Sequence, residues 1–109
     1  MLSTILKPIY KFEKLNFYGF DNYKIQIFDV DKNYYKIHLK LGLEPNCIDF
    51  NLTLPKSELT KILKNNTNKK HFLIFSYLMV NFGSNICEKY YFKGIEQTEV
   101  YYGASKLIL

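Results

Sequence analysis

The chain has 109 residues, a length that suits one domain with one hydrophobic core. Its formal net charge of +5 excludes an acidic mimic of DNA, and its 48% of hydrophobic residues is typical of a globular protein. All fifteen basic residues are lysines. Because arginine supplies the planar fork that reads guanine edges, base-specific recognition of duplex DNA is disfavoured, whereas non-specific contacts with phosphates remain compatible.

The N-terminal part of the chain is predicted to form a strand over residues 10–18. Ten tyrosines and nine phenylalanines favour strands throughout the chain. The apolar positions of this segment change phase midway, which predicts a bulge or bend near Glu13 and Lys14. A turn is expected by composition at residues 19–22.

The most regular pattern is a hairpin over residues 22–41, in which apolar and polar residues alternate with the period of a strand. A two-residue turn would place the apolar rows of the two arms on opposite faces of the sheet, so a three-residue turn at 31–33 is predicted. The resulting pairs are Ile27 with Ile37, Ile25 with Leu39, and Tyr23 with Leu41.

The same register predicts an unusual opposite face. It places Lys24 opposite Lys40, Gln26 opposite His38, and Phe28 opposite Lys36. The candidate binding residues on this face are Lys24, Phe28, Tyr34, Lys36, His38 and Lys40. One interpretation is a surface that faces an anion, and the other is a solvated outer face whose lysines also protect a sheet edge.

Further elements follow in chain order. A loop is expected at residues 42–46, a strand with one buried face at 47–54, and a short helix from Pro55 to about Asn65 that packs on the sheet. The run at 71–82 fits a buried strand or a buried helix, and its aromatics and the turn residues 83–85 favour a strand. More strands are expected at 86–92 and 98–102, with a turn at 93–94 and an edge strand or docked tail at 106–109.

This order predicts one α+β domain over residues 1–109, with a curved, mainly antiparallel sheet and one short helix packed on it. A small open barrel of the OB type, with a helix between its third and fourth strands, has a similar order of elements and is the alternative architecture.

The sequence carries no catalytic, metal-binding or cofactor signature, and we expect a non-enzymatic protein. Asp29 and Asp31 flank the hairpin turn, where aspartate commonly initiates turns. Cys47 and Cys87 lack the spacing of a metal site and are expected to be free thiols in a cytoplasmic protein. The longest apolar run, at 72–80, is far shorter than the roughly twenty residues of a membrane helix, so no membrane partner is expected.

Two functions from different classes are compatible with these features. The first is a binding protein whose lysine- and tyrosine-rich sheet face holds a nucleic acid or a nucleoprotein. The second is a small inhibitor, adaptor or immunity-type protein of a mobile element or virus that binds a single protein target. An exposed edge strand near the C-terminus would also be compatible with a homodimer.

Overall fold

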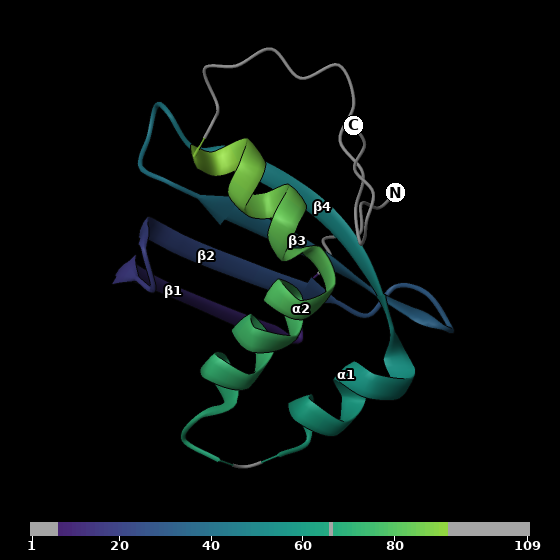
Figure 1. Ribbon diagram of the computed structural model, residues 1–109. Helices are drawn as coiled ribbons and strands as arrows, with labels where there is room; N and C mark the ends of the chain where they lie inside the picture. Colours follow the sequence, from purple (N-terminus) through teal and green to yellow (C-terminus); the bar gives the residue numbers. More distant parts are fainter. Residues whose placement is uncertain (1–6, 66, 92–109) are drawn as a thin grey trace. The chain divides into compact units, whose positions relative to one another are not determined.

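The computed structural model describes residues 7–65 and 67–91. They form an α+β fold, as predicted, in which four antiparallel strands pair in chain order (Figure 1). The elements are β1 (Tyr10–Phe17), β2 (Phe20–Phe28), β3 (Tyr34–Leu41), β4 (Ile48–Pro55), α1 (Lys56–Leu63) and α2 (Lys70–Tyr91).

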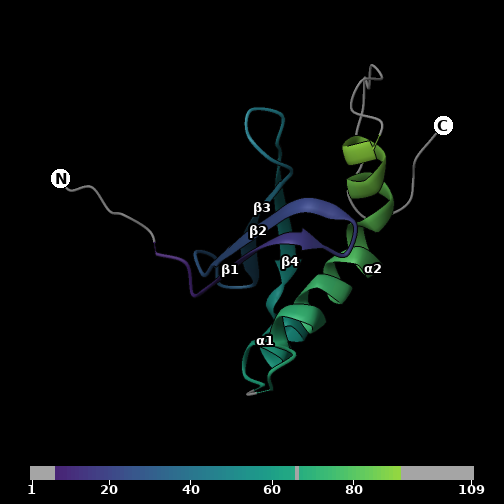
Figure 2. The same ribbon diagram turned by 90° about the vertical axis from the view of Figure 1, so that its left-hand side faces the viewer.

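The sheet is open, with β1 and β4 at its two edges. The strands turn strongly from β1 and β2 to β3 and β4, so the expected curvature is present (Figure 2). Within the described part of the chain the four strands pair in simple order and α1 follows β4, so no helix lies between β3 and β4, and the alternative of an OB-type barrel is wrong for these residues.

The register of β2 with β3 is the one that the alternation predicts. Ile27 lies opposite Ile37, and Ile25 lies opposite Leu39. All four side chains have at most 2% of their surface exposed, so this face of the hairpin is buried. Burying a branched apolar side chain stabilises a fold by about 1.5–3 kcal/mol, which makes any slip of the register costly.

In the hairpin of β1 and β2, the apolar side chains change from one face to the other at a different residue from the one predicted. The pairing of β1 with β2 keeps one register from end to end, so the bulge expected near Glu13 and Lys14 is wrong. The change occurs instead at Asn16, whose φ of 52° is left-handed. Beyond it Phe17 is buried, while Leu15 on the other side is 59% exposed.

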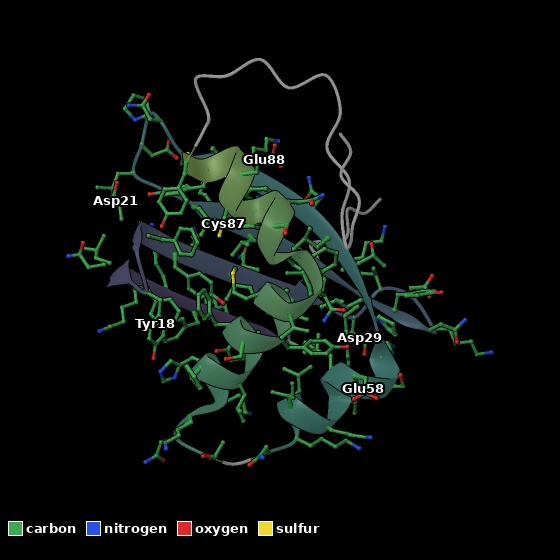
Figure 3. The ribbon with its side chains drawn as sticks, viewed as in Figure 1. Tyr18, Asp21, Asp29, Glu58, Cys87 and Glu88 are labelled. Atoms are coloured by element: carbon green, nitrogen blue, oxygen red, sulfur yellow. The ribbon has the colours of Figure 1, made fainter. Side chains whose placement is uncertain are left out.

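The helix predicted from Pro55 to about Asn65 is present as α1, but it begins at Lys56, because Pro55 is the last residue of β4. This helix is anchored to the hairpin of β2 and β3. The Lys56 ammonium pairs with the Asp29 carboxylate and lies 5.3 Å from the centre of the Tyr35 ring. Figure 3 labels Asp29 beside the start of this helix. The Tyr35 hydroxyl is also 3.0 Å from the Thr60 hydroxyl, and Leu59 is fully buried. These contacts hold the helix against the end of the hairpin.

The secondary structure of the C-terminal part of the described chain differs most from the prediction. At 71–82 the helical alternative is correct and the favoured strand is wrong, because residues up to Tyr91 form the single helix α2. The turn expected at 83–85 and the strand expected at 86–92 are wrong for these residues for the same reason. Its buried residues recur at intervals of three or four, as on one face of a helix. They are Ile74, Phe75, Leu78, Phe82, Asn85, Ile86 and Tyr90.

Two further predictions concern the elements after α2 and the number of domains. The elements expected at 93–94, 98–102 and 106–109 lie outside the described residues. The chain divides into two units between Leu63 and Lys64, and the expectation of a single domain over 1–109 remains a prediction.

The two possible assignments of residue 83, to a turn or to a helix, predict opposite effects of Gly83→Ala on the free energy of unfolding. In the helix, an added Cβ would lie 3.8 Å from Met79, at ordinary van der Waals distance. We therefore expect Gly83→Ala to raise the free energy of unfolding by about 0.5–1 kcal/mol, because alanine loses less backbone entropy than glycine. Urea denaturation followed by circular dichroism would measure it.

Gly42→Ala is the matched control, since Gly42 has a φ of 96° that alanine adopts only with strain. We expect it to lower the free energy of unfolding by about 1 kcal/mol or more. A loss of stability in both variants would contradict the helical assignment of Gly83.

Candidate functional site

The six predicted binding residues lie where the hairpin register placed them, on the outer face of the sheet. The pairs Lys24–Lys40, Gln26–His38 and Phe28–Lys36 are all present. Lys36 and Tyr34 are exposed, and the other four candidate residues are half-buried. Their positions are therefore confirmed, while their role in binding stays a prediction.

Acidic residues on the outer strands balance the two lysines that face each other. Glu13 in β1 lies opposite Lys24, and Asp49 in β4 lies opposite Lys40. The row across the four strands therefore reads acid, base, base, acid. Opposite charges across strands are mildly stabilising, and this arrangement offsets the repulsion expected between Lys24 and Lys40.

Two of the predicted binding residues have acidic partners at hydrogen-bond distance. Lys40 Nζ lies 2.7 Å from Glu44 Oε2, and His38 Nε2 lies 2.9 Å from Asp49 Oδ1. The hydrogen bond and the charge of Glu44 raise the pKa of Lys40, and the hydrogen bond from Lys40 lowers the pKa of Glu44. Within the described residues Lys36 is in no ion pair of this kind, which leaves its charge available.

Cys47, in the loop between β3 and β4, is half-buried and free. Desolvation and the neighbouring Glu44 carboxylate raise the pKa of Cys47. A raised pKa keeps the thiol protonated, the opposite of what activates a cysteine nucleophile.

An open groove of about 560 Å³ crosses the outer face over β2, β3 and β4. It is lined by Phe28, Val30, Lys36, Ile37, His38, Asn51, Leu52 and Thr53. The groove thus brings together three of the six predicted residues, from two strands. Lys24, Tyr34 and Lys40 do not line it.

The sequence analysis missed the contribution of β4 to this groove. Thr53 lies opposite Lys36, and Asn51 lies opposite His38. The alternation of β4 in the sequence already shows that both side chains point outward. It does not show that they lie beside Lys36 and His38, because that depends on the register of β3 with β4. Val30, which follows β2, was missed because it lies outside the alternating pattern.

The groove offers an aromatic ring, an ammonium group, an imidazole, an amide and a hydroxyl group, which can stack on a ligand or exchange hydrogen bonds with it. The two aspartates of the hairpin are engaged separately. Asp31 accepts hydrogen bonds from the backbone amides of Asn33 and Tyr34, at 2.8 and 3.2 Å, and Asp29 pairs with Lys56. This matches the turn role expected for Asp31.

Among residues 7–65 and 67–91, no group of three histidine, cysteine, aspartate or glutamate side chains is placed to hold a metal ion. In the same residues, neither helix combines the length and the apolar character needed to span a bilayer.

No protein-family model matches the chain, and neither a curated protein nor a solved structure shows significant similarity to it. The function is therefore argued from the geometry of the sheet alone.

The pairing of Lys40 with Glu44 makes a prediction about titration. We expect Lys40→Met to raise the pKa of Glu44 toward its ordinary value, because the variant removes the hydrogen bond and the charge that lower it. A carboxyl pKa lowered by folding stabilises the native state above the ordinary glutamate pKa, and this contribution disappears as pH falls through the lowered value. Carbon-13 NMR titration of the side-chain carboxyl would measure the shift.

Lys36→Met is the matched control, since Lys36 is not among the groups that shift the pKa of Glu44. An unchanged titration of Glu44 in the Lys40→Met variant would contradict the ion pair.

Proposed function

We propose that this protein is a non-enzymatic binding protein whose groove holds a short segment of single-stranded nucleic acid. The observation that supports this most is the juxtaposition of Phe28 and Lys36, which lie directly opposite each other on β2 and β3 and both line the groove. An aromatic ring beside a cation matches the alternation of base and phosphate along a nucleic-acid strand.

In this proposal Phe28 provides a stacking surface. The ring is half-buried, so its position is held by the sheet while part of it remains accessible. Bases stack on aromatic side chains with about 1–3 kcal/mol per base, and single strands, whose bases are not paired, allow this contact. Asn51 and Thr53 line the same groove and supply donors and acceptors for the edge of a stacked base.

Lys36 is the residue that contacts phosphate. It is exposed, and its neighbours on the adjacent strands β2 and β4 are the uncharged Phe28 and Thr53. A single ammonium group neutralises one phosphate as a point charge and reads no sequence. With no arginine in the chain, affinity with little sequence preference is expected.

The alternative, a protein-binding inhibitor, adaptor or immunity-type protein, is favoured by a different observation. The acids Glu13 and Asp49 flank Lys24 and Lys40, which makes this part of the outer face nearly neutral. Polyanions are attracted by a continuous positive surface, whereas protein interfaces combine charges of both signs with exposed tyrosine, such as Tyr34 at 44% exposure.

Binding of a fluorescent single-stranded oligonucleotide, measured by anisotropy at several salt concentrations, tests the proposal. We expect Phe28→Ala to weaken binding by about 1–3 kcal/mol with an unchanged salt dependence, because stacking releases no counterions. We expect Lys36→Ala to reduce the slope of log K against log salt by about 0.7, the value for one phosphate of a single strand.

Lys61→Ala is the matched control, because it removes the same charge from α1 and not from the sheet. If the protein does not bind the oligonucleotide, or binds it equally well in all variants, the nucleic-acid proposal is wrong. A stoichiometric complex with one protein and no oligonucleotide binding would establish the alternative.

A further inference from the structure

The edge strand β1 is unusually exposed for a strand that pairs along its whole length with a buried neighbour. Four consecutive residues, 13–16, are exposed, and so is Lys11. Within the described residues, only β2 pairs with β1, so the other edge of β1 has no strand beside it. An unpaired strand edge presents a row of backbone donors and acceptors that another strand can complete.

We propose that β1 pairs in antiparallel fashion with β1 of a second copy of this chain, around a two-fold axis at Phe12. The two four-stranded sheets then form one continuous sheet. A two-fold interface of this kind uses the same surface of both copies, so each contact occurs twice. This inference is independent of the proposed nucleic-acid binding.

The charges of β1 select this register. If Phe12 lies opposite Phe12 of the other copy, each Lys11 lies opposite a Glu13, which gives two cross-strand pairs of opposite charge on the outer face. The other symmetric registers with matching faces lack this complementarity. An axis at Lys11 or at Glu13 places that residue opposite its own copy, so like charges meet, and an axis at Lys14 does the same.

The inner face of β1 is also compatible with this pairing. Phe12 is half-buried, although Ile25, which lies opposite it in β2, is fully buried. The Phe12 ring contacts Phe17 and Tyr23, with centroids 5.5 and 6.0 Å apart, so its orientation is fixed. In the proposed register the remaining exposed part of each Phe12 ring faces its copy, and aromatic pairs across strands are stabilising.

The other edge of the sheet does not offer the same interface. β4 carries a single charged residue, Asp49, so no antiparallel pairing of β4 with itself brings opposite charges together. Charge complementarity therefore favours β1 over β4 as the edge that joins two copies.

Sedimentation equilibrium of the full chain over a wide concentration range tests this interface. We expect the unmodified protein to form dimers and Lys11→Glu to raise the dissociation constant roughly tenfold or more, because two opposite-charge pairs become two like-charge pairs. Lys11 lies opposite Gln26 within its own chain, so this variant creates no like-charge pair in the monomer. The combination of Lys11→Glu with Glu13→Lys restores both pairs and is expected to restore the dimer.

Lys14→Glu is the matched control, because it makes the same charge change in the same strand, and in this register residue 14 faces Tyr10 of the other copy. We expect its dissociation constant to stay close to that of the unmodified protein. Circular dichroism verifies that each variant folds, which matters for Glu13→Lys because Glu13 lies opposite Lys24 and accepts a hydrogen bond from Asn22. A strictly monomeric protein, or a dimer that Lys11→Glu leaves intact, would overturn the proposal.

Discussion

The register of β2 with β3 is the constraint on which the rest of the sheet depends. Because side chains alternate with a period of two, pairing Ile27 with Ile37 fixes the face of every other residue in both strands. The buried row provides most of the free energy that holds the register, and the positions of the outer row follow from it. Phe28 and Lys36 are therefore placed side by side by the packing on the other face of the sheet.

The outer face shows how a sheet tolerates two lysines directly opposite each other. The neighbouring strands supply Glu13 and Asp49 in the same row, and the loop after β3 supplies Glu44. This balance concentrates the uncompensated charge of the groove at Lys36. A lysine count therefore overstates the positive potential of the surface, since the effect of each ammonium group depends on the residues beside it on the adjacent strand.

The sequence predicts the fold best where one face of an element is buried and the other is solvated. β2, β3 and β4 alternate cleanly, and the odd length of the turn decides the register of the first two. For the first half of α2 the helix was the less favoured of two alternatives, because apolar residues also occupy its exposed face, as Val80 does at 83% exposure, and they hide the helical period. The contribution of β4 to the candidate site was missed because the partner of Lys36 on β4 depends on how the loop between β3 and β4 is folded.

The groove and the free edge use different strands, which makes them separable. Residues of β2, β3 and β4, with Val30, line the groove, whereas the proposed dimer uses only β1. A two-fold axis perpendicular to the sheet keeps the outer faces of both copies on the same side, so in the proposed dimer both grooves open on that side. Two weak sites on one rigid surface bind a long strand more tightly than either site alone, because the second contact becomes intramolecular. Dimerisation would thus compensate for a groove that has only one uncompensated lysine.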